Sequence, residues 1–327
     1  MTNADFIDKI RTTLAEYDML SEGETVCVGL SGGADSVSLL FALRELGGEL
    51  GFGVRAVHIE HGLRGEESEG DMRFCERLCG ELGVALEVRR LDLATVKEKH
   101  ESIEECARKA RYKAFEEVMR GDKLATAHNL NDNAETVLLN LMRGTGLRGL
   151  CGIPPKRGSI IRPLIRCSRG EVEEFCRGNG LEYVTDSTNL SDDYTRNRVR
   201  HAILPEMLKI NPSLPDTISR MTDMLRTDSV FLEELAEKAL AECACGKGWS
   251  AAELDRLPTP VKSRAVRKIL SDGDIEPSSL RINTALSLLN RRSARFNPCR
   301  DRFFTIRKGI CFVEKTEQHY RKLDKKP

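Results

Sequence analysis

The sequence lacks the long apolar run that a membrane helix needs. A bilayer span takes about 20 consecutive apolar residues, and no stretch of the 327 residues approaches that length. Residues 1–8 contain neither a basic segment nor an apolar core, so we expect no signal peptide and a cytoplasmic protein. The hydrophobic content of 40% and the charged content of 31% are ordinary for a globular protein.

A Cys-x-x-Cys pair is also missing, although the chain holds 11 cysteines. Cys75 and Cys79 are four residues apart, and Cys243 and Cys245 are two apart. We interpret both pairs as buried apolar thiols rather than halves of a metal site. Because no export signal is visible, we expect reduced thiols instead of disulfides.

The chain has no net charge, with 51 Lys and Arg against 51 Asp and Glu, but the two signs are unevenly spread. Residues 255–327 hold 18 Lys and Arg against 8 Asp and Glu, which leaves 33 against 43 for residues 1–254. A basic end on an acidic chain suits a phosphate-rich partner such as RNA. A solvated helical surface would give the same composition.

The most informative stretch is Val26–Ser36, which reads VCVGLSGGADS. It begins as a buried strand, turns at Gly32 and Gly33, and opens into an apolar helix. That arrangement points free backbone N–H groups at an anion, and glycines leave room for a phosphate. No Lys follows the glycines, so this is not a Walker A loop. Asp35 would repel a phosphate, so we interpret it as a Mg²⁺ ligand or as a carboxylate bonded to nearby backbone.

Strands and helices alternate through residues 1–210, which predicts a doubly wound, mostly parallel α/β sheet. After Pro215 we expect helices without strands, with a long helix from about 216 to 244. A hairpin with a Lys308-Gly309 turn follows. We therefore predict a catalytic domain, a smaller helical subdomain and a short terminal hairpin with a basic tail, over residues 1–210, 211–300 and 301–327. The expected strands are 26–30, 54–59, 85–88, 123–127 and 160–164, and the expected helices include 67–82, 102–120, 134–142 and 194–207.

Ligands of such sheets bind at the carboxyl ends of the strands, so the loops after Leu30, Ile59 and Ala127 are candidates for one shared site. His58 and His61 lie at the second strand end, where they could bind a ligand, hold zinc or have no ligand role. His128, Asp132 and Glu135 follow the fourth strand. Carboxylates at that position either complement the helix dipole or bind an ammonium group or a proton.

Arginines supply the third group of candidates. Arg108 and Arg111 share a polar stripe with Glu105 and Tyr112 on the helix predicted over 102–120. The stripe would be ordinary solvated surface, or it would face the cleft and clamp a phosphate.

Taken together and in this order, these motifs resemble those of bacterial tRNA(Ile)-lysidine synthetases, members of the PP-loop ATP pyrophosphatase superfamily. The resemblance covers about residues 24–205. It rests on the segments 31–36 (SGGADS), 61–68 (HGLRGEES), 107–112 (ARKARY), 128–136 (HNLNDNAET), 143–150 (RGTGLRGL), 186–189 (DSTN) and 194–200 (YTRNRVR).

The resemblance implies that ATP activates the wobble cytidine of a tRNA(Ile) with a CAU anticodon, and that L-lysine then replaces AMP at C2. It implies ATP and Mg²⁺ as cofactors, with Mg²⁺ on Asp35, and leaves a homodimer open. The implied catalytic residues are Asp35, Arg108, His128, Asp132 and Glu135. The implied ATP-binding residues are Ser31, Gly32, Gly33, Ala34, Asp35, Ser36, His58 and His61, and the implied contacts to tRNA or the intermediate are Arg111, Arg143, Arg196, Asn197 and Arg200.

Three other functions compete. A PP-loop tRNA thiolase would usually need a cysteine pair or an iron–sulfur cluster, and no Cys-x-x-Cys occurs. An amide-forming synthetase would need an ammonia source, commonly a glutaminase domain, and we see no spare length for such a domain before residue 24. A non-catalytic ATP-binding module would leave the grouping of His128, Asp132 and Glu135 unexplained.

Overall fold

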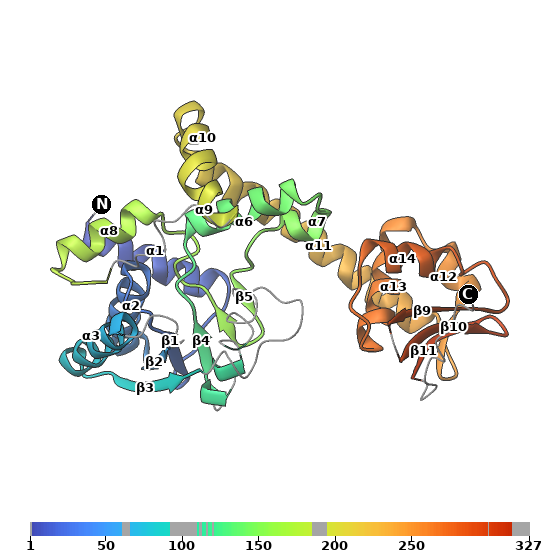
Figure 1. Cartoon of the computed structure of the whole chain (residues 1–327), viewed down its shortest axis with the longest axis horizontal. Coiled ribbons are helices and arrows are strands. Elements are labelled where there is room, and N and C mark those ends of the chain that lie inside the picture. Colours follow the sequence, from blue (N-terminus) through green and yellow to red (C-terminus); the bar gives the residue numbers. More distant parts are fainter. Residues whose placement is uncertain are drawn as a thin grey trace, which may run out of the picture. The chain divides into compact units, whose positions relative to one another are not determined.

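The computed structural model describes residues 2–60, 66–91, 110, 113–115, 117–119, 121–184, 195–299 and 301–315, without the side chains of Glu66 and Glu67. The chain forms two compact units, Met1–Asp223 and Met224–Pro327. Figure 1 shows the strands of the first unit and the antiparallel strands of the second. Within the described ranges, no helix combines the length and the apolar character needed to cross a membrane.

A six-stranded sheet organises the first unit, in the order β3-β2-β1-β4-β6-β5. All pairs are parallel except the short pair of β5 with β6. After β1, the chain adds β2 and β3 on one side of β1, and it then adds β4 on the other side. The topological switch point therefore lies between β1 and β4. The bounds are β1 Thr25–Gly29, β2 Gly53–Glu60, β3 Ala85–Arg90, β4 Lys123–Ala125, β5 Lys156–Arg157 and β6 Ile160–Ile161. This confirms the predicted fold class.

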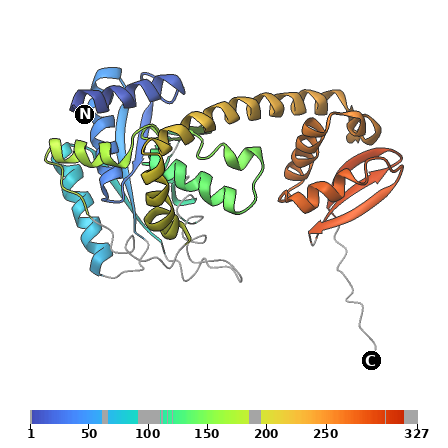
Figure 2. The ribbon, with the colours of Figure 1, turned by 90° about the horizontal axis from the view of Figure 1, so that it is seen from above.

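Both faces of β1 are buried, which explains why its sequence is continuously apolar rather than alternating. Val26 and Val28 belong to the main core, with α1, α2, α3 and α8, whereas Cys27 packs with Phe115 in a second cluster. The Phe6 ring of α1 stacks on Phe175 of α8 at 4.3 Å between centroids. Figure 2 shows α1, α2 and α8 side by side.

Helices α1, α2, α3 and α8 pack beside the sheet in the main core, and the first unit contains further helices. The bounds are α1 Asn3–Glu16, α2 Ala34–Leu50, α3 Glu66–Leu82, α6 Leu130–Met142, α7 Leu147–Leu150, α8 Arg169–Gly178, α9 Thr195–Arg198, the π-helix η2 Val199–Ile203 and α10 Leu204–Ile210. Ser168 caps α8 through a reciprocal pair of hydrogen bonds with Glu171, as its Ser-x-x-Glu spacing indicates.

The second unit contains a five-stranded antiparallel sheet in the order β7-β8-β11-β10-β9. Its core joins the sheet to α13 and α14 through Phe304 of β10, Ile269 of α13 and Ala285 of α14. Lys308 and Gly309 both have positive φ, as a tight β10–β11 turn needs. The bounds are α11 Leu214–Glu242, β7 Ala244–Cys245, β8 Gly248–Ser250, α12 Ala251–Arg256, α13 Thr259–Asp272, α14 Ser279–Leu286, β9 Ala294–Cys299, β10 Arg302–Arg307 and β11 Ile310–Lys315.

Several sequence expectations need correction. The hairpin is confirmed, but the expectation of a strand-free stretch after Pro215 is wrong, because β7, β8 and β9 join that hairpin in one sheet. These strands are short or carry polar residues, so they give no clear period-2 signal. The division between the units lies at 223/224 instead of 210/211, inside the continuous helix α11.

Several element bounds also differ from the prediction: β4 ends at Ala125 instead of 127, and the helix predicted over 194–207 is divided into α9, η2 and α10. Helix α6 begins at Leu130 rather than 134, because Asn129 caps it. Strand β6 is confined to Ile160–Ile161 and does not extend to 164. The predicted helix over 102–120 lies mostly outside the described residues.

Candidate active site

The loop between β1 and α2 is shaped by its own hydroxyl groups. The Ser36 hydroxyl donates to the Gly33 carbonyl at 2.9 Å and accepts from the Ser31 amide at 3.1 Å. Ser36 is buried, whereas Ser31 is exposed. Ser36 therefore holds the loop in shape, and Ser31 remains accessible to a ligand.

The two glycines of this loop serve different purposes. Gly32 has φ +89°, a conformation that disfavours other residues, and lies against Phe74 and Cys75. Gly33 caps α2 with extended backbone and without any side-chain hydrogen bond. A helix N-terminus capped by glycine keeps its backbone donors accessible, which suits an anion.

Asp35, in the first turn of α2, faces the start of α6. The Asn129 amide nitrogen donates to its Oδ1 at 2.8 Å. Burial and the nearby Asp132 charge raise the pKa of Asp35 to about 6, although Asn129, Arg169 and Arg200 act in the opposite direction. A carboxylate destabilised by burial and by a second carboxylate is one that a cation would stabilise.

Helix α6 is fixed at its start by a capping box. The Asn129 side-chain oxygen accepts from the Asp132 amide, and Asp132 Oδ2 accepts from the Asn129 amide, both at 3.0 Å. Glu135 lies one turn further along and is only 1% exposed. The predicted pair of carboxylates on one helix face is therefore present, and Asp132 is already partly engaged by backbone.

Two arginines from the segment after β6 and α8 complete this group. Arg200 Nε lies 2.6 Å from Glu135 Oε1, and its Nη2 lies 3.0 Å from Asp132 Oδ1. Arg196 Nε lies 3.0 Å from Glu135 Oε2. We call Asp132, Glu135, Arg196 and Arg200 the acid–arginine cluster. Its formal charges sum to zero, which allows Glu135 to be buried as an ion.

The backbone around Arg200 is unusual, because it belongs to the π-helix Val199–Ile203. Such wide turns are frequent at functional sites. Burial alone would lower the pKa of Arg200, but its hydrogen bond to Glu135 and the charges of Glu135 and Asp132 raise that pKa above its ordinary value. Arg200 is therefore a permanent cation in this site.

The histidines face the backbone and nearby side chains. His58 Nδ1 lies 2.9 Å from the Leu30 carbonyl oxygen, so the buried ring donates to the residue just before the loop. His128 Nδ1 lies 3.0 Å from the Thr126 hydroxyl. No group of three or more metal-ligating side chains occurs among the described residues, which gives no support there to a zinc site at His58.

The remaining candidates are partly or fully exposed, or lie outside the described residues. Arg143 is exposed at the end of α6, and Asn197 is partly exposed on α9. His61, Arg108 and Arg111 lie outside the described residues. Sequence reasoning missed Asn129, which joins Asp35 to the acid–arginine cluster. Its signal was the Asn-x-x-Asp spacing immediately after a strand, which is a helix-capping pattern.

A glycine-capped helix at the switch point of a parallel sheet, with a charged cluster beside it, defines a nucleotide-binding α/β domain. The comparison with known families identifies it further. The chain belongs to the PP-loop domain family, whose model matches residues 3–207.

Curated relatives point the same way. The chain is 38% identical over 274 residues to a tRNA(Ile)-lysidine synthase of Caldanaerobacter subterraneus subsp. tengcongensis, covering 80% of this chain and 58% of that protein. It is 42% identical over 261 residues to one of Parabacteroides distasonis, covering 78% of this chain and 58% of that protein. The chain thus spans about three fifths of the length of these relatives.

Among solved structures, the U34-tRNA thiolase NcsA of Methanococcus maripaludis matches with a TM-score of 0.58 at 24% identity, over 68% of this chain and 78% of that chain. This likeness supports the fold alone.

The raised pKa of Asp35 gives a prediction on stability. Below the unfolded pKa of 3.8, Asp35 is protonated in both states; above about pH 6 the folded state must hold a disfavoured charge. Asp35→Asn should therefore stabilise the apoprotein at pH 8, by up to roughly 2–3 kcal/mol, and the gain should vanish near pH 4. Urea unfolding in EDTA across this pH range measures it.

Asp5→Asn is the control of opposite sign. Asp5 accepts from the Thr2 amide, which lowers the pKa of Asp5, so this substitution should lower stability at neutral pH. A stability difference between Asp35→Asn and wild type that is the same at pH 4 and pH 8 would contradict the raised pKa.

Proposed function

We propose that this protein uses ATP to attach L-lysine to C2 of the wobble cytidine of a tRNA(Ile) with a CAU anticodon. The product, lysidine, changes codon reading from AUG to AUA. The observation that carries the proposal is the hydrogen bond from Asn129 to Asp35, which joins the start of α2, just after the glycine loop, to the start of α6, the helix of Asp132 and Glu135. The similarity to tRNA(Ile)-lysidine synthases over about four fifths of the chain supports it.

The first step would be adenylation of the base. The C2 carbonyl oxygen of the cytidine attacks the α-phosphorus of ATP, an O–P bond forms, and pyrophosphate leaves. Gly32, Gly33 and Ser31 would bind the phosphates with the first turn of α2. The target base must leave its stack to reach this loop.

The oxygen donor and the destabilised charge of Asp35 fit a magnesium ion bound together with phosphate oxygens. Asp35 would hold the ion, which when bound neutralises phosphate charge. His58 would support the loop from behind through the Leu30 carbonyl.

The second step would be attack of the lysine ε-amine on C2, which breaks the bond between C2 and the oxygen that leaves with AMP. An ammonium group is no nucleophile, so the amine must first lose a proton. Asp132 and Glu135 would bind the ammonium, and His128, Asp132 or Glu135 would accept the proton. His128 lies three residues after the end of β4, on the same side of the sheet as the loop.

The acid–arginine cluster can exchange partners during this reaction. When a phosphate arrives, one of Arg196 and Arg200 can bind it, and the lysine ammonium can take the place of that arginine beside Asp132 and Glu135. Each exchange replaces one opposite-charge pair by another, so no charge is left buried without a counterion. Arg108, Arg111, Arg143 and Asn197 would contact the RNA or the adenylated base.

The second unit would assist by binding the body of the tRNA. It carries exposed arginines at Arg291 and Arg292, and Arg295 lies over the Phe303 ring at 3.7 Å. Glu314 pairs with Arg295, so part of this basic surface is already neutralised. We also propose a cytoplasmic location. Sedimentation of the purified chain would test for a homodimer.

Transfer of radiolabelled lysine to a tRNA(Ile) transcript tests the proposed reaction. We expect ATP-dependent transfer by wild type, with one pyrophosphate released per lysine attached. Asp35→Ala should abolish pyrophosphate release while the protein stays folded. Sulfur incorporation without lysine would favour the thiolase, and ATP binding without either product would favour a simple binding module. A folded Asp35→Ala protein that releases pyrophosphate at the wild-type rate would remove Asp35 from the reaction.

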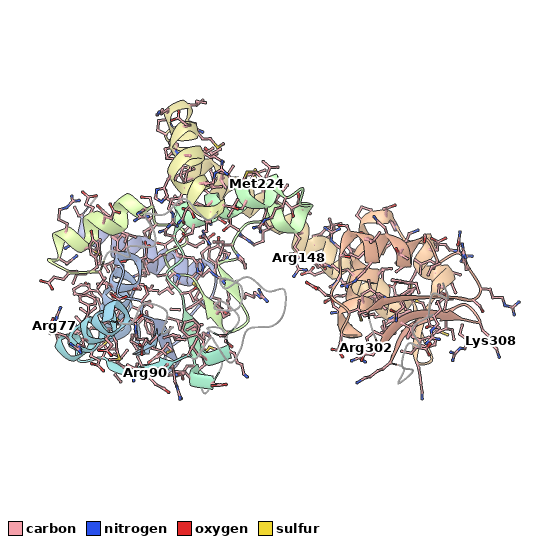
Figure 3. The ribbon with its side chains drawn as sticks, viewed as in Figure 1. Arg77, Arg90, Arg148, Met224, Arg302 and Lys308 are labelled. Atoms are coloured by element: carbon pink, nitrogen blue, oxygen red, sulfur yellow. The ribbon has the colours of Figure 1, made fainter. Side chains whose placement is uncertain are left out.

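Charge reversal tests the proposed role of the second unit. Arg291→Glu with Arg292→Glu should weaken tRNA binding and reduce the slope of log affinity against log salt by about one for each lost phosphate contact. Arg73→Glu with Arg77→Glu is the matched control, because Arg73 and Arg77 are two exposed arginines on α3 of the first unit, where Figure 3 labels Arg77. Equal effects from both changes would show only a general charge effect.

A further inference from the structure

Asn129 is a buried amide whose two polar atoms serve the two halves of the site. Its side chain is 3% exposed, and it stands between β4 and α6. Its Oδ1 accepts from the Asp132 amide at 3.0 Å, and its Nδ2 donates to Asp35 Oδ1 at 2.8 Å. Because both ends of one planar amide are engaged, the direction of the donor toward Asp35 is fixed.

The connection reaches across 94 residues of sequence. The Asn129 Nδ2 binds the Asp35 carboxylate in the first turn of α2. The Asn129 Oδ1 binds the backbone amide of Asp132, and the side-chain Oδ1 of Asp132 lies 3.0 Å from Arg200 Nη2. A change in the orientation of Asn129 would therefore disturb both the loop and the cluster.

We propose that Asn129 is a positioning residue. It orients the Asp35 carboxylate, and it holds the loop between β1 and α2, here called the nucleotide loop, at a fixed position relative to the acid–arginine cluster. The inference rests on the proposed function, since it assigns Asp35 to the bound nucleotide. Asn129 acts through Asp35 and does not itself take part in bond making.

Helix capping alone does not account for asparagine here. Ser, Thr and Asp cap helices about as well as Asn, and Ser168 makes the same reciprocal capping pair on α8. Aspartate has no donor and would set a third carboxylate beside Asp35 and Asp132. A Ser or Thr hydroxyl accepts and donates at one oxygen atom, close to the backbone. Asparagine accepts and donates at two separate atoms of one planar amide, and here each atom has a different partner.

The test is a double-mutant cycle on nucleotide affinity. Asn129→Ser keeps a good cap and removes the donor to Asp35. We expect it to weaken binding of the uncleavable analogue α,β-methylene-ATP, with Mg²⁺ present, by about tenfold, since hydrogen bonds to charged groups are strong. In an Asp35→Ala background the same substitution should change affinity by less than about twofold, because the two residues act as a unit. Titration calorimetry on the full chain gives all four affinities.

Asn133→Ser is the matched control. It is the same substitution on the same helix, and Asn133 is equally buried, but its amide binds the Ile153 amide and the Thr222 hydroxyl instead of Asp35. It should lower the melting temperature and leave the affinity for the analogue within about twofold of wild type.

Two results would overturn the role of Asn129: wild-type affinity in Asn129→Ser, or a loss of the same size with and without Asp35. The measurement uses neither tRNA nor lysine. If the effect of Asn129→Ser depends on Asp35 but no lysine is transferred, only the proposed reaction is refuted. If lysine is transferred but the effect of Asn129→Ser does not depend on Asp35, only the role of Asn129 is refuted.

Discussion

The parallel pairing of β1 with β4 is the interaction on which the rest of the site depends. Val28 lies opposite Ala125 in this pair, and both strands end within a few residues of that point. The chain leaves β1 through the glycine loop and leaves β4 through Asn129, so α2 and α6 begin near each other at the carboxyl ends of these strands. The hydrogen bond between Asn129 and Asp35 then fixes the distance between the two helix starts.

The charged side chains at the carboxyl ends of β1 and β4 are arranged in a way that favours binding of a charged ligand over the stability of the fold. Asp35 is held where burial and Asp132 disfavour its charge, and Glu135 is buried as an ion that needs both arginines. A protein that only had to fold would avoid both arrangements, because apolar packing is as stabilising as a buried ion pair or more so. Charged groups kept in such positions are typical of sites that receive a charged ligand.

Much of the first unit could be predicted from local sequence. The apolar run before the glycines, the Ser168 cap and the carboxylate spacing on α6 each follow from short-range rules. The pairing of Arg196 and Arg200 with Asp132 and Glu135 could not, because it joins segments 61 to 68 residues apart. Nor could the sheet of the second unit, since β7 and β8 have only two and three residues, and they pair with each other and, through β8, with the distant strand β11.

Hydrogen exchange of backbone amides with and without α,β-methylene-ATP and Mg²⁺ tests most directly whether these two strand ends form one site. Our account predicts slower exchange in residues 30–37 and also in residues 128–136, because the nucleotide loop and the start of α6 are held together through Asn129. It predicts no change in β9–β11 of the second unit. Protection confined to the loop, or protection centred on the second unit, would contradict a shared site.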